Sequence, residues 1–239
     1  MILAAGNSFT NSIDLNYPGI MTEFDGRPLV QWIIEDIIPL KQDKIVIIVN
    51  QEDINRYHID RTLKLIQPMI EVVGVSSNIG GAACSALIGL QFLNQEDEVL
   101  IINGNEKLTE DHFLLMSQIY EKKTNASVVS FDSIHPRYSY VKVDSNQNVI
   151  EVSEKDPISR NALVGFFWFS QVSIIDTAIK RMIMKGASLN DVYYLSPAIN
   201  ELVLEGIKVS MIKVENSKYH PMKSEWQLSE YAKNIDRSK

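Results

Sequence analysis

Lys44-Ile45-Val46-Ile47-Ile48-Val49 is a near-continuous run of β-branched residues. A strand that is hydrophobic at every position, rather than at every second one, is typical of a parallel sheet covered by helices on both faces. The run therefore predicts a buried central strand and an α/β fold.

Hydrophobic runs on either side of this strand alternate with helical patterns. Further strands are expected at residues 1–5, 70–75, 99–102 and 126–131, and helices at 28–38, 55–66, 82–93 and 110–122. Such alternation predicts a mixed, mainly parallel sheet with helices on both faces. We expect the first four strands to share one sheet, with their carboxyl ends facing a common cleft and Val99–Ile102 inside the sheet.

The pattern changes in the second half of the chain. Strands are expected at 138–143, 149–153 and 162–169, then helices at 172–185 and 189–204, a strand at 207–214 and an amphipathic segment at 224–235. No Gly/Ser linker separates the two parts. We therefore predict a single domain over residues 1–239, whose halves, 1–131 and 132–239, share one sheet.

Composition limits the classes of partner. The 239 residues are 45% hydrophobic and 22% charged, with a net charge of −7, as in ordinary globular proteins. This charge excludes a basic surface for nucleic acid or an anionic membrane. Cys84 is the only cysteine, and the hydrophobic runs are far shorter than the ~20 residues of a membrane helix. We expect a cytoplasmic protein.

Three loops at predicted strand ends are candidates for ligand binding, because ligands of open α/β sheets bind at the carboxyl ends of the strands. They are Gly6–Phe9, Ser76–Ala82 and Asn103–Glu106. Gly6 allows close backbone approach, and successive amides there can bind phosphate. No Lys-Ser or Lys-Thr follows at P-loop spacing, so a P-loop is excluded.

Several motifs occur in a specific order along nearly the whole chain. They are Leu3-Ala4-Ala5-Gly6, Tyr17-Pro18, Phe24-Asp25-Gly26-Arg27-Pro28-Leu29, Gly80-Gly81-Ala82-Ala83-Cys84-Ser85, Ile102-Asn103-Gly104-Asn105, Ser139-Tyr140-Val141, Val149–Lys155 with its Glu154-Lys155 pair, Ile158–Phe167, and the single residues Tyr193, Pro197, Asn200 and Glu201. Together they resemble the sugar-phosphate nucleotidyltransferases, in the branch linked to capsule and surface-polysaccharide biosynthesis. These enzymes join a nucleoside triphosphate (NTP) to a phosphorylated metabolite and release pyrophosphate.

The resemblance implies a Rossmann-like, glycosyltransferase-A-like fold with a nucleotide-binding half over residues 1–131 and an acceptor-binding half over 132–239. It implies that the nucleotide contacts Leu3, Ala4, Ala5, Gly6, Asn7, Gly80, Gly81 and Ala82. It also implies that the acceptor contacts Tyr140, Glu154, Lys155 and Gly165. Glu154 and Lys155 are the candidates for catalysis, with Glu154 bound to the acceptor and Lys155 to its phosphate. Asn105 stands at the position of the Mg²⁺ ligand.

The sequence departs from the family pattern on the triphosphate side. The usual Gly-x-Gly-x-Arg reads Gly6-Asn7-Ser8-Phe9-Thr10, and the usual Pro-Lys reads Pro18-Gly19. The metal-binding aspartate is Asn105, and the Gly-Thr-Pro-acid motif near the end reads Lys223-Ser224-Glu225-Trp226-Gln227. Because phosphoryl-type transfer depends on charge neutralisation, these losses weaken the expected site. We expect weak nucleotide binding through backbone amides, with a shallow salt dependence.

Other interpretations fit parts of the sequence. The losses favour a catalytically impaired relative that serves as a binding or regulatory subunit. A nucleotide-sugar-dependent glycosyltransferase shares the sheet architecture, but it expects an Asp-x-Asp motif that the sequence lacks. Glu154-Lys155 is alternatively a surface ion pair at a strand end, and Asn105 a turn residue. The sequence leaves the NTP, the acceptor and the oligomeric state open.

Overall fold

The computed structural model describes residues 1–6, 18–224, 226–227 and 229–231. Its centre is a mixed sheet in which one path of strands runs β10-β9-β11-β6-β1-β4-β5. The parallel part consists of β1 (Ile2–Leu3), β4 (Ile45–Asn50), β5 (Ile70–Val75) and β6 (Val99–Asn103). These strands confirm the predicted parallel core.

The β-branched run that predicted a buried central strand forms β4, which lies at the centre of this core. Residues 45–49 of β4 are all buried, because β4 pairs with β1 on one side and β5 on the other while helices cover both faces. β6 lies between β1 and an antiparallel neighbour, so Val99–Ile102 is inside the sheet, as predicted.

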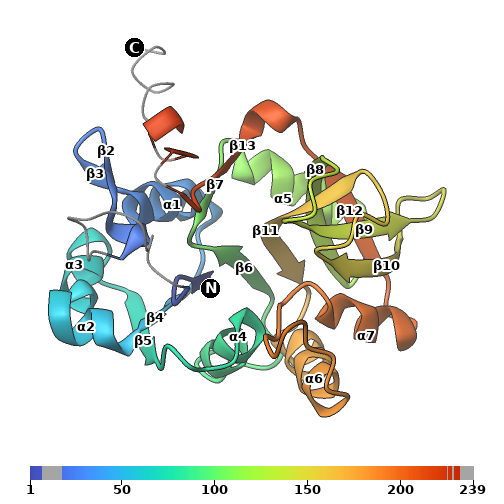
Figure 1. Ribbon diagram of the computed structural model, residues 1–239, viewed down its shortest axis with the longest axis horizontal. Helices are drawn as coiled ribbons and strands as arrows, with labels where there is room; N and C mark the ends of the chain where they lie inside the picture. Colours follow the sequence, from blue (N-terminus) through green and yellow to red (C-terminus); the bar gives the residue numbers. More distant parts are fainter. Residues whose placement is uncertain (7–17, 225, 228, 232–239) are drawn as a thin grey trace.

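The second half of the chain extends the same sheet. It contributes β8 (Ala126–Asp132), β9 (Ser139–Val143), β10 (Val149–Glu154), β11 (Asn161–Phe169) and β12 (Val209–Lys213). β11 pairs antiparallel with β6, β8 and β9 and thereby joins the two halves. In Figure 1 this junction lies to the right of β6, with β9, β10 and β12 beyond it.

Helices cover the sheet on both faces. They are α1 (Leu29–Ile37), α2 (Gln51–Tyr57), α3 (Ile59–Ile66), α4 (Ala82–Leu90), α5 (His112–Glu121), α6 (Val172–Met184) and α7 (Ala198–Leu204). One hydrophobic core contains side chains of α1, α3 and α5, and a second contains those of α4, α6 and α7. Figure 1 shows α1 and α5 above the sheet and α4, α6 and α7 below it. None of the helices in the described residues is long and apolar enough to cross a membrane.

Two predicted helices differ from the structure. The helix expected at 55–66 is divided into α2 and α3 by His58, whose φ of 53° is left-handed. The helix expected at 189–204 begins only at Ala198, so this prediction was wrong for residues 189–197. There Asn190 and Asp191 have φ values of 52° and 59°, which form a tight turn instead of a helix.

Several short elements outside the main sheet were not predicted. They are the pair β2 (Glu23–Phe24) and β3 (Arg27–Pro28), the pair β7 (Glu106–Leu108) and β13 (Tyr219–Pro221), and 3-10 turns at Gly19–Met21, Ile38–Leu40 and Asn216–Lys218. Residues 226, 227 and 229–231 are helical, whereas the rest of the predicted amphipathic segment beyond 231 lies outside the described residues.

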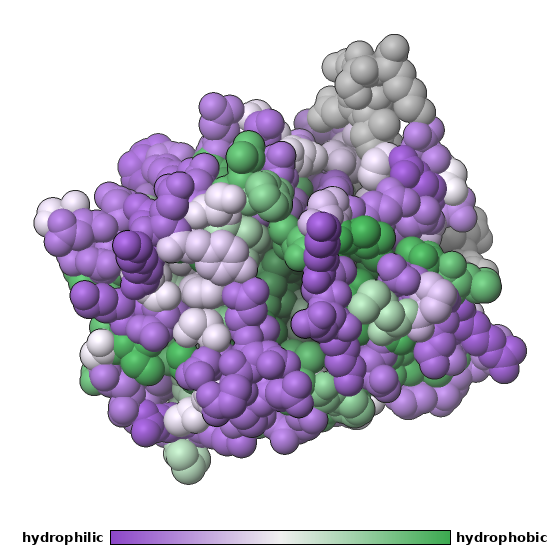
Figure 2. Space-filling view, turned by 180° about the vertical axis from the view of Figure 1, so that it is seen from behind, coloured by the Kyte–Doolittle hydropathy of each residue, from purple (hydrophilic) through white to green (hydrophobic). Residues whose placement is uncertain are grey.

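A groove of about 480 Å³ lies at the amino ends of the parallel strands, where Met1, Ile45 and Val99 line it. The face seen from behind is hollowed near its centre, and hydrophobic residues line the hollow (Figure 2). The predicted nucleotide loops and the predicted metal position instead follow the carboxyl ends of β1, β5 and β6, and Glu154-Lys155 lies at the end of β10, so the candidate site lies elsewhere.

Candidate functional site

The ends of β1 and β6 bring the first predicted loop against the predicted metal position. The Gly104 amide donates to the Leu3 carbonyl oxygen at 2.7 Å, immediately before Asn105. A Cβ on Gly104 would lie 2.9 Å from Ala4 Cβ, so only glycine permits this approach. Gly6 is exposed, and no atom of the described residues lies within 4 Å of where its Cβ would stand. Asn7 lies outside the described residues.

The second predicted loop forms the amino end of α4. Gly80 and Gly81 have φ values of 88° and 122°, and Ala82 is the first residue of the helix. Gly81 caps the helix without a side-chain hydrogen bond. Backbone amides at a helix amino end carry partial positive charge and favour an anionic ligand. The loop therefore has the chemistry that the prediction of nucleotide contacts requires.

Residues 193–196 connect this loop to the acceptor side. The Tyr193 amide donates to the Gly80 carbonyl oxygen at 2.8 Å, and the Ala83 amide donates to the Tyr193 carbonyl oxygen at 3.0 Å. A Cβ on Gly81 would lie only 2.5 Å from that carbonyl oxygen. The glycine thus allows the segment after the 190–191 turn to pack directly on the Gly80–Ala82 loop.

The same segment fixes Glu154, the last residue of β10. Ser196 Oγ donates to Glu154 Oε2 at 2.7 Å, and Ser139 Oγ donates to the same oxygen. Ser196 Oγ also lies 2.9 Å from Ser139 Oγ. Within the described part of the chain, no group donates to Oε1. Glu154 is therefore held by two hydroxyls with one carboxylate oxygen left to accept a ligand's hydrogen bond.

Lys155 follows Glu154 in a left-handed conformation, with φ at 58°. Its ammonium donates to the Tyr194 hydroxyl at 2.6 Å and lies 4.6 Å from the centroid of that ring. Its amide donates to the Tyr138 carbonyl oxygen at 3.0 Å. Glu154 and Lys155 do not form an ion pair with each other in the described structure, so the surface ion pair that was the alternative interpretation is not found.

Helix α7 holds β10 in place behind this pair. The Asn200 side chain accepts from the Val152 amide and donates to the Val152 carbonyl oxygen, both at 2.8 Å. Glu201 of the same helix is buried and pairs with Lys185 at 2.7 Å. A side-chain amide that satisfies both backbone groups of one residue fixes the strand two residues before Glu154.

Two predicted acceptor residues have structural roles. Tyr140 is fully buried, and its hydroxyl donates to the His135 carbonyl oxygen at 2.7 Å. Gly165 is buried in β11, where a Cβ would collide with the side chains of Glu106 and Asn103. Contact between either residue and an acceptor stays a prediction.

Glu106 was not predicted as a site residue. It is 6% exposed, and its Oε2 accepts from the Tyr219 hydroxyl at 2.7 Å, while Oε1 has no partner among the described residues. Burial, together with the nearby Glu106, raises the pKa of the Tyr219 hydroxyl well above its usual value. Next to it, Lys107 pairs with Asp36 in a mostly buried position. No sequence motif marks Glu106, because its neighbours come from residues 165 and 219.

The donors around Asn105 do not fit a Mg²⁺ ion held by the protein. Asn105 is exposed and offers a neutral amide, whereas Mg²⁺ favours carboxylate oxygens. Among the described residues, no group of three or more His, Cys, Asp or Glu side chains is arranged to hold a metal ion. A Mg²⁺ ion held by the described residues around Asn105 would therefore lack the carboxylate ligands that it favours.

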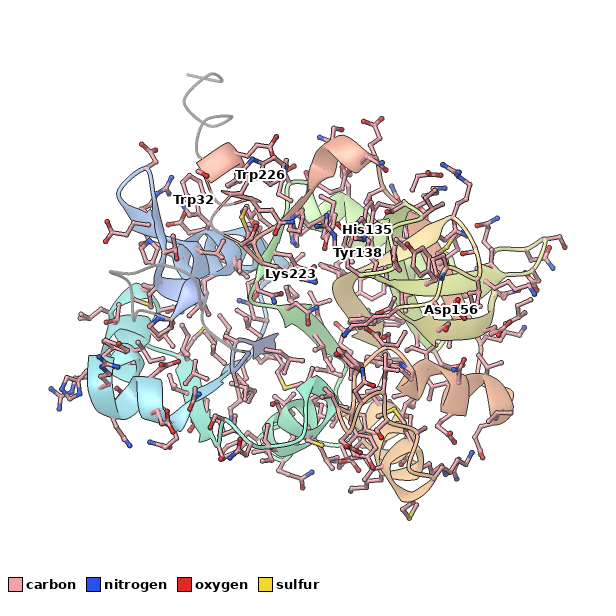
Figure 3. All side chains as sticks on the ribbon, viewed as in Figure 1. Trp32, His135, Tyr138, Asp156, Lys223 and Trp226 are labelled. Atoms are coloured by element: carbon pink, nitrogen blue, oxygen red, sulfur yellow. The ribbon has the colours of Figure 1, made fainter. Side chains whose placement is uncertain are left out.

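Figure 3 shows how the side chains around the centre of the molecule are arranged. Lys223 lies between Trp32 on one side and His135 and Tyr138 on the other, and Asp156 lies below these two. Trp226 lies above Lys223 in this view.

The model of the family described as "Nucleotidyl transferase" matches residues 16–206, well over half of the chain. No curated protein sequence matches. The matched range contains α4, β6, the Glu154-Lys155 pair and the 193–196 segment.

Solved structures share the fold across almost the whole chain. A nucleoside-diphosphate-sugar pyrophosphorylase from Vibrio cholerae has a TM-score of 0.82 at 14% identity, covering 97% of this chain and 99% of that one. A UDP-glucose pyrophosphorylase complexed with UDP-glucose has a TM-score of 0.81 at 14% identity, covering 100% and 98%. The inositol-1-phosphate CTP transferase from T. maritima has a TM-score of 0.75 at 16% identity, covering 97% and 92%. Sequence motif order, sheet topology and the family match agree, and the chain belongs to the nucleotidyl transferase family.

Proposed function

We propose that this protein joins an NTP to a phosphorylated sugar or another small phosphorylated metabolite and releases pyrophosphate. An oxygen of the acceptor's phosphate attacks the α-phosphorus of the NTP. A new P–O bond forms there, the bond between the α-phosphorus and the α,β-bridging oxygen breaks, and pyrophosphate leaves with that oxygen. The product is a nucleoside diphosphate linked to the acceptor. No protein nucleophile is needed.

The arrangement of Glu154 and Lys155 carries this proposal. Ser139 and Ser196 hold one oxygen of the Glu154 carboxylate, so Oε1 can accept a hydrogen bond from an acceptor hydroxyl. The adjacent Lys155 supplies an ammonium, which forms charge-assisted hydrogen bonds with phosphate. A hydroxyl-binding carboxylate beside a phosphate-binding cation is the pair that a sugar phosphate requires.

Proximity of the two halves supports transfer between two bound ligands. Tyr193 is bonded to Gly80 of the nucleotide loop, and Ser196 is bonded to Glu154 of the acceptor pair. Three residues of chain span at most ~11 Å. Two ligands bound at these places can therefore meet, and holding reactants in place provides much of the rate enhancement in such reactions.

A role in surface-polysaccharide precursor synthesis is part of the proposal. The family resemblance supports it, because the branch that the motifs resemble is associated with capsule and surface polysaccharides. The substrates would then be an NTP and a sugar phosphate, or a phosphorylated amino acid or amino alcohol.

A screen for pyrophosphate release tests the proposal. Four NTPs are combined with a panel of sugar phosphates and phosphorylated amino-acid or amino-alcohol acceptors, in Mg²⁺, in Mn²⁺ and in EDTA. Pyrophosphate should appear for at least one pair, and only when both substrates are present. Release that needs no acceptor indicates NTP hydrolysis and contradicts the proposal.

A binding or regulatory subunit is the second candidate, and one observation favours it. The Lys155 ammonium is bonded to Tyr194 rather than free, and the chain lacks the basic residues of the usual triphosphate loop. Acceptor binding without pyrophosphate release for any NTP would favour this role.

A further inference from the structure

β7 and β13 bring Lys223 to a position beside Asn105. Their register pairs Pro221 with Glu106. The next amide along the chain, that of Met222, donates to the Asn105 carbonyl oxygen at 2.9 Å. Lys223 is therefore the residue directly after the one bonded to Asn105, although 118 positions separate the two in the sequence (223 − 105).

The backbone of Lys223 is fixed from the other side as well. Its amide donates to Gln227 Oε1 at 2.9 Å, and the Gln227 amide donates to Ser224 Oγ at 3.3 Å. Gln227 is buried. Reciprocal bonds of this kind stabilise the first turn of a helix. The place of Lys223 beside Asn105 is thus set by the fold and not by the lysine's own side chain.

The side chain of Lys223 is exposed, and its ammonium has no partner among the described residues. Met222 is fully buried and Lys223 is exposed, so their side chains point in opposite directions. Within the described part of the chain, no carboxylate pairs with Lys223. Figure 3 places this side chain between Trp32 and the pair His135 and Tyr138. An exposed lysine therefore directly follows the residue that is bonded to Asn105, the position where the family resemblance puts a metal.

We propose that Lys223 takes over the charge-neutralising role of a divalent cation, so that the triphosphate binds without a protein-held metal. The inference rests on the proposed function. An ammonium group offers three donors to phosphate oxygens and needs no carboxylate ligands from the protein. Mg²⁺, by contrast, requires octahedral oxygen coordination with carboxylates among its ligands.

The same account explains why Asn105 is an amide. An aspartate at this position would form an ion pair with Lys223 and neutralise it. The amide leaves the ammonium free, and its NH₂ group can itself donate to a phosphate oxygen. The sequence departs from the family pattern by the loss of a carboxylate at residue 105 and by a cation at residue 223. Both changes favour direct binding of the triphosphate by the protein.

Isothermal titration of the full chain tests the inference. The ligands are four ribonucleoside triphosphates and inorganic tripolyphosphate, each titrated in EDTA and in excess Mg²⁺. The variants are Lys223→Ala, Lys223→Arg and, as a matched control, Lys122→Ala, which removes an exposed lysine at the end of α5. We expect the wild-type affinity to change less than twofold between EDTA and Mg²⁺.

Lys223→Ala should weaken polyphosphate binding about tenfold in both buffers, because the ligand loses a charged hydrogen-bond partner. Lys223→Arg should keep most of the affinity, and Lys122→Ala all of it. If triphosphates bind only with Mg²⁺, or if Lys223→Ala binds like wild type, the inference is overturned while the proposed function stands. If no triphosphate or tripolyphosphate binds in either buffer, both are overturned.

Discussion

At the scale of residues, the central feature is a carboxylate and an ammonium that are oriented by other side chains. Ser139 and Ser196 hold Glu154, and Tyr194 holds Lys155. Each partner is a neutral hydroxyl, so neither charge is cancelled. A phosphorylated ligand can displace the Tyr194 hydroxyl from Lys155 at little cost, since it offers a charged acceptor instead of a neutral one.

Lys155→Gln should weaken acceptor binding about tenfold, because a phosphate loses a charge-assisted hydrogen bond. NTP binding should not change. Both affinities are measured by calorimetry on the folded variant. Lys142→Gln is the control, because it removes an exposed lysine of β9 whose carboxylate neighbour, Glu151, is 3.9 Å away. Equal effects of the two substitutions on acceptor binding would remove Lys155 from the site.

The sequence predicted Glu154 and Lys155 but not the side chains that hold them. Ser139 and Ser196 lie 15 and 42 positions from Glu154, and no local sequence pattern marks a serine that forms a hydrogen bond at such a separation. In the sequence, Lys223 is recognisable only as a departure from the family pattern. Its proximity to Asn105 depends on the β7–β13 pair, which was not predicted. Residue types could be predicted at motif positions, whereas their partners depend on tertiary contacts.

At the scale of elements, the segment from Asn190 to Pro197 connects the two sides of the site. The sequence predicted a helix here from hydrophobic spacing. The structure instead has a left-handed turn at 190–191, followed by Tyr193 bonded to the Gly80 loop. Backbone hydrogen bonds to a distant loop replaced those of the helix, and no local pattern reveals such a partner. The strands of the parallel core, in contrast, could be predicted because burial on both faces leaves a continuous β-branched run.

Gly81→Ala should destabilise the fold by about 2–4 kcal/mol, since a left-handed residue is strained and the new Cβ collides with Tyr193. Gly206→Ala is the matched control: its φ of 72° is also left-handed, but no atom lies within 4 Å of the new Cβ. Urea unfolding of both variants measures the difference. If Gly81→Ala costs no more than Gly206→Ala, the packing of residue 193 on this loop is not important for stability.

At the scale of the whole molecule, β11 makes one sheet out of two halves. It pairs with β6, whose end leads into Asn105, and with β9, which carries Ser139 at its start. The predicted nucleotide residues and the predicted acceptor residues therefore come from different halves, and their relative placement depends on β11. Strand alternation predicted each half, but the antiparallel pairing of β11 with β6 could not be derived from hydrophobic pattern alone, because both strands are buried on both faces.

The stability of the whole fold should fall as the pH is lowered from about 7 to 5. The pKa of His112 is lowered below 6.5, chiefly by burial and in addition by the charge of Lys107. Burial and Lys107 lower the pKa of His220 in the same way. The unfolded chain then binds more protons in this range, so stability is full above about pH 6.5 and is lost as the pH falls through the folded-state pKa.

His112→Gln should flatten this dependence, each histidine accounting for at most about 1.4 kcal/mol per pH unit. Urea unfolding at pH 5, 6 and 7 measures it. His58→Asn, at an exposed left-handed position, should leave the slope unchanged. If the unfolding free energy of the wild type is constant over this range, the lowered pKa values of His112 and His220 are contradicted.

The central claim is that the acceptor's own phosphate attacks the α-phosphorus of an NTP. Phosphorus-31 NMR of the reaction mixture tests it most directly, using the substrate pair that releases pyrophosphate. The account predicts pyrophosphate together with a pair of coupled doublets from a new diphosphate bridge, in equal amounts, and a marked loss of both in Lys155→Gln. Nucleoside mono- or diphosphate as the only nucleotide product, with the acceptor phosphate unchanged, would contradict it.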